Sequence, residues 1–171
     1  DKVDEYKQYE EDLLEKYALD EVEEEPTVYF AGSDLLTCAT DDMYQGEILS
    51  YAQADNAIDA EGSSWVNIDI ETLLAANPDY VFIEAGSLSA DDFKNDARVQ
   101  ELQAVQNDHV YVFPSTLETW DTPSLSSCLG KLWAASILHP ELVSMDDVEA
   151  EAVAFYEQFY GFTPEAQDLA L

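Results

Sequence analysis

Two tryptophans in segments without regular periodicity offer the clearest potential for chemistry in this sequence. Trp65 and Trp120 both lie outside the stretches that have a helix or strand pattern. A flat indole provides a large apolar face and one N–H donor, which suits a bulky chelate or a macrocycle. The alternative for each is that the ring fills the protein's own core. The two residues therefore indicate ligand binding, with packing as the other interpretation.

Motifs for catalysis are absent from the sequence. There is no GxGxxG or GxxxxGK[ST] loop for a nucleotide and no GxSxG turn for a nucleophilic serine. His109 and His139 lack HxxxH or HExxH spacing and border strand or helix ends, so we expect structural roles for both. We expect no enzyme activity, no catalytic residue, no metal site and no cofactor. A metal-dependent hydrolase would need clustered ligands that the sequence does not show.

Adjacent acidic residues could hold a hard cation through their oxygens. They occur at Asp41–Asp42, Asp91–Asp92 and Asp146–Asp147, but none lies in a DxDxDG loop with a closing glutamate. Helix capping accounts for at least the last two pairs, because Asp146 followed by Glu149 resembles a capping box. We therefore interpret these pairs as structural.

The chain is strongly acidic, with 38 Asp and Glu against 6 Lys and Arg and a net charge of -32 over 171 residues. This charge excludes nucleic acid and anionic lipid as partners. The acidity fits either a surface adapted to high salt or acid, or a dedicated cation-binding surface. Because the charges are spread along the whole chain, we favour the first.

Length and hydropathy predict one folded domain without a membrane span. A hydrophobic content of 47% is enough for a sizeable core. No apolar run approaches the roughly 18 to 20 residues that cross a bilayer, and the charged first residues do not resemble a secretory signal. We expect a mature or excised chain.

Strand and helix patterns alternate along the chain. Runs typical of buried strands occur at 27–30, 80–83 and 110–113. Helical patterns lie between and around them, at 3–19, 43–52, 70–76, 91–102, 123–138 and 146–160. The alternation predicts an α/β fold, a three-layer sandwich with a mostly parallel central sheet and flanking helices. Ligands of such sheets lie beyond the carboxyl ends of the strands, here the loops Gly32–Asp42, Glu84–Ser89 and Ser115–Thr122.

Residues 65–83, WVNIDIETLLAANPDYVFI, resemble the "W..is.E.ll..nPD.ii" signature of class III periplasmic binding proteins, which take siderophores, haem and cobalamin. Residues 102–113, LQAVQNDHVYVF, resemble the "l.Avk.g.Vy" segment of the same family. Weaker matches at 123–141 and 155–161 follow in the family's order. One turn departs from the pattern, because the family's Gly-Gly-x-Asn is replaced by residues 53–56, QADN.

The resemblance implies a two-lobed protein of which this sequence holds the C-terminal lobe. Residues 1–25 are similar to the tail of the helix that joins the lobes, followed by an acidic linker, and residues 26–171 form the lobe. By this resemblance, we expect the N-terminal lobe to be missing from the sequence. The implied function is extracytoplasmic capture of an iron(III) chelate, such as a siderophore, by a periplasmic protein or cell-surface lipoprotein for an ABC permease. Cobalamin or haem is the alternative ligand, and a non-transport interaction or adhesion domain is the alternative function.

The resemblance also implies roles for individual residues. Trp65 matches a tryptophan that contacts the ligand in cobalamin-binding members, and Glu118 and Trp120 belong to a loop that faces the ligand in the family. Tyr44 is a further candidate, because a phenol can stack on a ligand or coordinate ferric iron. Glu71 matches the glutamate that pairs with arginines of the permease.

The two cysteines form no recognised motif. Cys38 and Cys128 are too far apart in sequence for CxxC. They could be neighbours, because one follows the first strand and the other starts the helix after the last strand. A bond needs Cα atoms within about 7 Å, and two unpaired thiols are the alternative.

Overall fold

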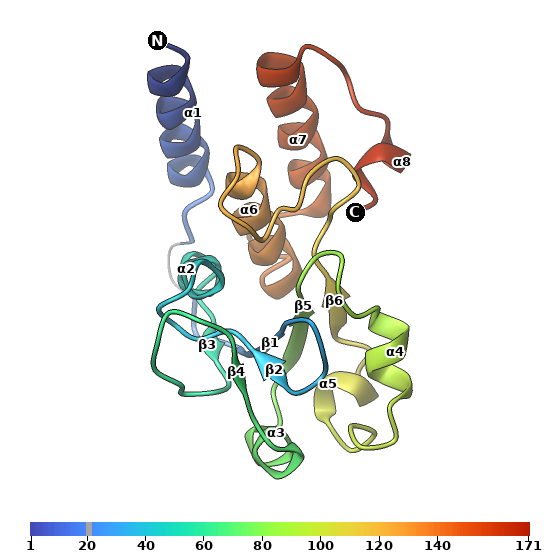
Figure 1. The fold of residues 1–171 in the computed structure, drawn as a ribbon. Coiled ribbons are helices and arrows are strands. Elements are labelled where there is room, and N and C mark those ends of the chain that lie inside the picture. The colour runs from blue at the N-terminus through green and yellow to red at the C-terminus, as the bar shows by residue number, and fades with distance from the viewer. Residues whose placement is uncertain (20–21) are drawn as a thin grey trace.

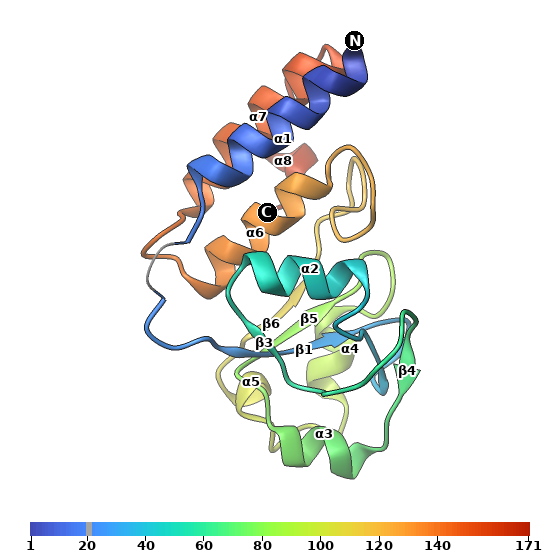
Figure 2. The same cartoon turned by 90° about the vertical axis from the view of Figure 1, so that its left-hand side faces the viewer.

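The computed structural model describes residues 1–19 and 22–171 of the chain, and within them six strands form one sheet between two layers of helices (Figures 1 and 2). The central strands are β1 (Thr27–Ala31), β5 (Tyr80–Ile83) and β6 (Val110–Val112). They pair in parallel, with Phe30 opposite Phe82 and Phe82 opposite Tyr111. The three strongest strand predictions are confirmed.

Three two-residue strands extend the sheet beside β1. These are β2 (Thr37–Cys38), β3 (Asp55–Asn56) and β4 (Val66–Asn67). β2 pairs antiparallel with β1 and β4 antiparallel with β2, whereas β3 runs parallel to the first half of β1. Three of the five pairings in the described residues are parallel, so the predicted mostly parallel sheet is confirmed. The sequence did not reveal the short strands, because two residues carry no alternation.

Helices cover both faces of the sheet (Figure 2). One layer contains α1 (Lys2–Lys16), α2 (Tyr44–Tyr51), α6 (Ser127–Leu138) and α7 (Met145–Tyr160), with α8 (Ala166–Leu169) beside α7. The other contains α3 (Ile70–Ala76), α4 (Ala90–Asn95) and α5 (Gln103–Gln106). Alternate strand residues serve the two cores: Phe30 and Phe82 face the first, and Tyr29 and Val81 the second, all fully buried. The predicted three-layer sandwich is confirmed.

Several predicted helix boundaries were wrong, and local hydrogen bonds explain two of them. The helix expected from Pro123 begins at Ser127, because Thr119, Thr122 and Ser124 bond to one another and hold the preceding residues in turns. The capping box of α7 joins Ser144 to Asp147, not Asp146 to Glu149.

Two other helices are shorter than expected. The helix predicted at 91–102 ends at Asn95 as α4, because the Asp96 carboxylate accepts a bond from the Arg98 backbone N–H and turns the chain; α5 begins only at Gln103, beyond the predicted range. The first helix ends at Lys16, not near Leu19. No helix within residues 1–19 and 22–171 combines the length and apolar character needed to cross a bilayer.

α1 attaches to α7 through an aromatic cluster. The ring of Phe159 lies 5.2 Å from Tyr9 and 5.8 Å from Tyr6, both edge-on. Glu151 accepts hydrogen bonds from Lys16 Nζ at 2.6 Å and from the Tyr17 hydroxyl at 2.9 Å. Because exposed ion pairs contribute little, the aromatic contacts supply most of the attachment.

Cys38 and Cys128 are unpaired and lie in the cores on opposite faces of the sheet. The alternative of two free thiols is therefore the correct one. Burial raises the pKa of Cys38 to about 11 and that of Cys128 to about 12, so both thiols stay protonated at neutral pH.

Gly130 allows α6 to pass against the loop that precedes it. A Cβ at this position would overlap the carbonyl oxygen of Trp120 and lie 2.8 Å from its carbonyl carbon. We expect Gly130→Ala to lower the free energy of unfolding by about 2 to 4 kcal/mol, because neither backbone segment can yield locally. Urea denaturation measures the change.

Gly161→Ala is the matched control, because its φ of 74° is strained for alanine but nothing lies within 4 Å of the added Cβ. Gly161→Ala should lower the free energy of unfolding by about 1 kcal/mol. Equal losses for the two variants would contradict the close approach at Gly130.

Candidate functional site

The loops after β1, β5 and β6 meet along one edge of the sheet, on the right of Figure 2. We call residues 32–42, 84–89 and 113–122 the carboxyl edge. Parallel pairing brings them together, because all three strands end on the same side. The edge includes the loops predicted from the sequence to meet a ligand, namely Gly32–Asp42, Glu84–Ser89 and Ser115–Thr122.

Trp65 lies against this edge. A Cβ on Gly32, the residue after β1, would lie 2.7 Å from the indole, and the ring centroid is 6.4 Å from that of Phe30. Trp65 is only half-buried, although it packs against the first core. Part of an apolar ring is thus held rigidly at the end of the central strand, where it can serve as one wall of a ligand site.

Trp120 is placed differently. Its side chain is 2% exposed, and its indole N–H donates to the Tyr156 hydroxyl at 3.2 Å. Trp120 therefore packs in the core, the alternative stated for it in the sequence analysis. The indole N–H, which is the ring's only hydrogen-bond donor, already binds Tyr156. Its part in a site would be to support the loop that carries it.

Glu118 and Tyr44 lie in different parts of the structure and do not form one site. Glu118 is half-buried in the loop after β6, and its Oε2 lacks a hydrogen-bond partner among the described residues. Tyr44 points towards α6, donates to the Ser127 carbonyl at 3.3 Å and has Lys131 Nζ 5.4 Å from its ring. Burial raises the pKa of Tyr44 above its ordinary value, which disfavours the phenolate that would coordinate ferric iron.

Glu71 is exposed in the first turn of α3. Asp69 caps this helix as expected, accepting from the Thr72 N–H at 2.8 Å, and hydrogen bonding to the side chain and backbone of Thr72 lowers the pKa of Asp69. The cap fixes the turn from which Glu71 projects.

Asp121 is a residue of this edge that sequence reasoning missed. It is fully buried; its Oδ2 accepts from the Ala85 N–H at 3.0 Å, and its carbonyl accepts from Gln45 Nε2 at 2.9 Å. Its Oδ1 has no partner among the described residues. Burial, reinforced by the charge of Glu84, raises the pKa of Asp121 to about 6. The only feature of the sequence that could have indicated Asp121 is its position directly after Trp120 in this loop.

The histidines and two acidic pairs have structural roles, as expected. His139 donates from Nε2 to the Ala52 carbonyl at 2.8 Å, and His109 stacks on Tyr80 at 4.4 Å. Ser89 and Ser144 cap α4 and α7, and the carboxylates of Asp92 and Asp147 accept hydrogen bonds from these two capping residues. Within residues 1–19 and 22–171, no three His, Cys, Asp or Glu side chains are grouped to hold a metal.

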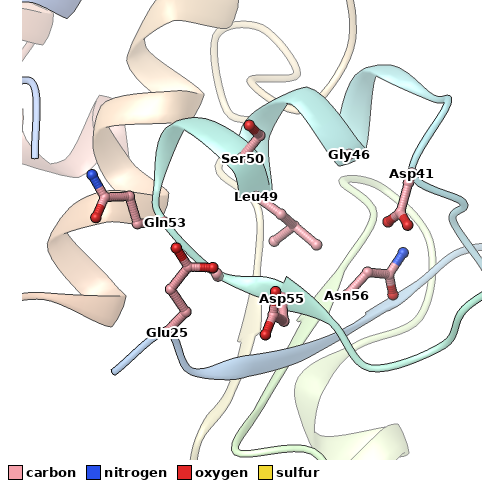
Figure 3. Close-up of a pocket in the computed structure, with 9 residues that line it drawn as sticks. Glu25, Asp41, Gly46, Leu49, Ser50, Gln53, Asp55 and Asn56 are labelled. Carbon is pink, nitrogen blue, oxygen red and sulfur yellow. The ribbon is translucent and has the colours of Figure 1, made fainter. Parts of the chain in front are cut away.

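A hollow of about 420 Å³ lies beside α2 and β3 and meets the carboxyl edge only at Asp41 (Figure 3). It includes the turn at which the sequence departs from the family pattern. Gln53 adopts a left-handed φ of 47°, the conformation that glycine favours, and Asn56 Nδ2 donates to the Ala39 carbonyl at 3.1 Å. The turn is therefore formed without glycine, at a cost of about 1 kcal/mol. Gln53 Nε2 also bonds the Leu19 carbonyl.

Comparison with known sequences identifies relatives of the chain. Residues 1–117 match the family model described as periplasmic binding protein. Molybdate-binding protein MolA of Haemophilus influenzae is 25% identical over 134 residues, which are 77% of this chain and 38% of MolA. The part of MolA that aligns in sequence is thus well under half of its length.

Solved structures share the fold. A periplasmic solute-binding protein from Veillonella parvula superposes with a TM-score of 0.83 at 19% identity, over 96% of this chain and 51% of that one. CeuE of Helicobacter pylori, in a Ni-His complex, superposes with a TM-score of 0.82 at 20% identity, over 96% of this chain and 54% of the CeuE chain. The structure of MolA bound to molybdate superposes with a TM-score of 0.79 at 22% identity, over 95% of this chain and 51% of the MolA chain. The chain covers about half of each.

The buried carboxyl of Asp121 makes stability depend on pH. Because its pKa is 3.8 in an unfolded chain and about 6 when folded, the folded protein holds a proton that the unfolded chain loses between these values. The protonated Asp121 carboxyl therefore contributes to the free energy of unfolding fully below about pH 4, and this contribution is lost as the pH rises through about 6. Asp121→Asn keeps an acceptor for Ala85 and cannot ionise. Relative to wild type, we expect the variant to gain about 1 to 3 kcal/mol between pH 4 and pH 8.

Urea denaturation of both proteins across this range measures the difference. Glu11→Gln, on the exposed face of α1, serves as the control and should show no such trend. A difference between Asp121→Asn and wild type that stays constant with pH would contradict the raised pKa.

Proposed function

Because the chain belongs to the periplasmic binding protein family, we propose that it is the C-terminal lobe of an extracytoplasmic solute-binding protein. In this proposal the protein captures an iron(III) chelate or a related metal-containing ligand, performs no chemistry on it, and delivers it to an ABC permease. The observation that carries the proposal is the half-buried indole of Trp65 fixed on Gly32 at the carboxyl end of β1.

The proposed ligand class is supported by relatives of different specificity. MolA is named for molybdate, and the CeuE structure is a Ni-His complex. What these ligands share is a metal centre. An aromatic wall adds preference for a ligand with an extended apolar or planar surface, which a ferric siderophore, haem or cobalamin provides.

We propose that residues 1–25 comprise the end of the interlobe helix and a linker, and that residues 26–171 form the lobe. α1 packs on α7 through Tyr6, Tyr9 and Phe159, so the two parts would move together. The N-terminal lobe would supply the opposite wall, because one edge leaves most of a ligand in water. Membrane attachment as a lipoprotein belongs to the same proposal.

The site residues divide by exposure. Trp65 and Glu118 would contact the ligand directly, since both are partly exposed at the edge. Trp120 would act beneath them, because its ring is buried against Tyr156. Tyr44 is the weakest member, as its hydroxyl is bonded to the Ser127 carbonyl.

Trp65 provides a direct test. In the two-lobed protein we expect calorimetric titration with ferric siderophores, haem and cobalamin to give at least one submicromolar complex. Trp65→Leu should weaken it by about tenfold or more, because a large apolar contact is lost. Residues 1–171 alone should bind the same ligand weakly or undetectably.

Phe162→Leu is the matched control, because Phe162 is an aromatic of 42% exposure beyond α7. It should leave affinity within about twofold of wild type. If no chelate binds, or if the two variants behave alike, the proposed ligand edge is wrong.

Glu71 tests delivery separately from capture. Charges across an interface orient partners and speed association while adding little to folding stability. We expect Glu71→Ala and Glu71→Arg to leave ligand affinity and Tm near wild type but to reduce ATPase stimulation by the cognate permease, with arginine the more severe.

Asp146→Ala and Asp146→Arg are matched controls, since Asp146 is also an exposed acid in the first turn of a helix. They should leave coupling unchanged. If both Glu71 variants stimulate the permease ATPase as the wild type does, Glu71 has no role in docking.

A further inference from the structure

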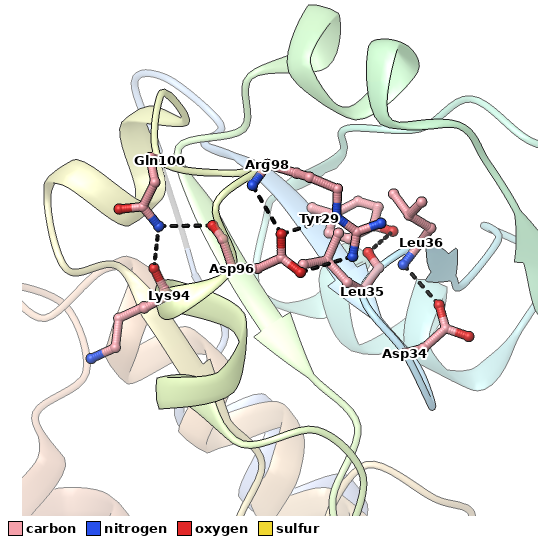
Figure 4. Close-up of polar contacts among 8 residues, drawn as sticks. All are labelled: Tyr29, Asp34, Leu35, Leu36, Lys94, Asp96, Arg98 and Gln100. Atoms are coloured by element: carbon pink, nitrogen blue, oxygen red, sulfur yellow. Dashed lines mark hydrogen bonds and ion pairs between the residues drawn. The ribbon is translucent and has the colours of Figure 1, made fainter.

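The loop after β6 differs from the other two loops of the carboxyl edge in how it is held. In the loop after β1, the Asp34 carboxylate accepts a hydrogen bond from the Leu36 N–H at 2.9 Å (Figure 4). In the loop after β5, the Ser87 hydroxyl donates to the Glu84 carboxylate at 2.8 Å. The first two loops of the edge therefore contain bonds that fix them from within.

Residues 115–118 of the loop after β6 lack such bonds. The Trp120 N–H donates to the Pro114 carbonyl at 3.1 Å and closes the loop around them, but no backbone–backbone hydrogen bond among the described residues involves 115–118 themselves. Burial and the adjacent Glu118 carboxylate raise the pKa of Tyr160, which places Glu118 beside the end of α7. The position of this stretch must therefore come from the packing of side chains.

The C-terminal segment, residues 163–171, packs against this loop (Figure 1). Leu169 of α8 is 2% exposed and borders a narrow gap that it shares with Leu117 and Trp120. The gap has no room for a water molecule, and the other residues around it belong to the same loop, to α7 and to α8. Leu169 therefore supports the loop from behind.

Tyr156 of α7 joins the two parts. Its hydroxyl accepts from the Trp120 indole N–H at 3.2 Å, and its side chain borders the same gap as Leu169. α8 has only four residues, with a capping box between Glu165 and Asp168. A helix of this length is not stable by itself. The C-terminal segment thus depends on the contact that Leu169 makes, and the loop and the segment stabilise each other.

We propose that the C-terminal segment positions the loop after β6 for ligand binding, with Leu169 as the positioning residue that acts through Trp120. The inference rests on the proposed function and deepens it, because one wall of the ligand site then depends on the far end of the sequence. Leu169 itself does not touch the ligand. A loop that is already held in its binding position loses less conformational entropy when the ligand arrives, which raises affinity.

Hydrogen exchange of backbone amides tests the positioning without a ligand. The Trp120 amide, bonded to the Pro114 carbonyl, and the Ala85 amide, bonded to the Asp121 carboxylate, report on opening of the loop. Leu169→Ala should speed exchange at both amides about tenfold, because every opening of the loop breaks the contact that the variant has already lost. Leu169→Met keeps most of the apolar volume and should stay within about twofold of wild type.

Leu13→Ala is the matched control, because Leu13 is a leucine of 3% exposure on α1. This variant should speed exchange at the Val81 amide, which lies inside the sheet and is bonded to the His109 carbonyl, because that amide exchanges when the whole fold opens. It should leave the Trp120 and Ala85 amides within about twofold of wild type, since the loop can open while the Leu13 contact stays intact.

Calorimetric titration of the two-lobed protein with ferric siderophores, haem and cobalamin tests the consequence for binding. Leu169→Ala should weaken the tightest of these complexes about fivefold or more. Leu13→Ala should lower Tm as well but change affinity less than about twofold, and so should Leu169→Met. A role of Leu169 in overall stability alone predicts the same affinity for the two alanine variants.

The outcomes distinguish this inference from the proposed function. Equal acceleration of the Trp120 and Ala85 amides by the two alanine variants means that the loop opens only with the whole fold, which overturns the inference. Faster loop exchange in Leu169→Ala with unchanged ligand affinity also overturns it and leaves ligand capture standing. If none of the three kinds of probe binds the wild-type protein, the proposed function fails, and positioning of the loop for a ligand fails with it.

Discussion

The central strands β1, β5 and β6 are paired in parallel, and this pairing constrains the rest of the molecule; β1 and β5 are buried on both faces, and β6 is partly buried. Parallel neighbours cannot be joined by hairpins, so each connection must cross a face of the sheet, mostly as helix. The crossovers bury Phe30 and Phe82 on one side and Tyr29 and Val81 on the other. The same pairing gathers three loops at one edge, which is why one side of the sheet has the candidate site.

The loops of that edge pack closely against neighbouring segments at three glycines. Gly32 lies under Trp65, Gly46 against the Asp41 carbonyl, and Gly130 against the Trp120 carbonyl. Asp121 joins two further segments through Ala85 and Gln45. A wall held in this way keeps its shape without a ligand, and adaptation to a ligand would have to come from side chains or from movement of whole lobes.

Much of this fold could be predicted from the sequence, because the central strands are continuous apolar runs and α3 is bounded by Asp69 and Asn77. The resemblance carried by residues 65–83 is likewise confirmed by the family match. The two-residue strands and the turns before Ser127 could not be predicted, since their hydrogen bonds depend on segments distant in sequence or on local hydroxyl contacts. The position of Trp65 followed from family pattern, whereas burial of Trp120 and the role of Asp121 depend on packing that no local pattern encodes.

The three tryptophans differ in their access to solvent, which gives the protein an intrinsic optical reporter. Trp120 and Trp133 are 2% and 4% exposed, whereas Trp65 is only half-buried at the carboxyl edge. A small quencher dissolved in water reaches Trp65 before the other two, so the long-wavelength part of the emission comes mainly from that ring. The long-wavelength emission of this protein therefore reports on the surface where a ligand would arrive.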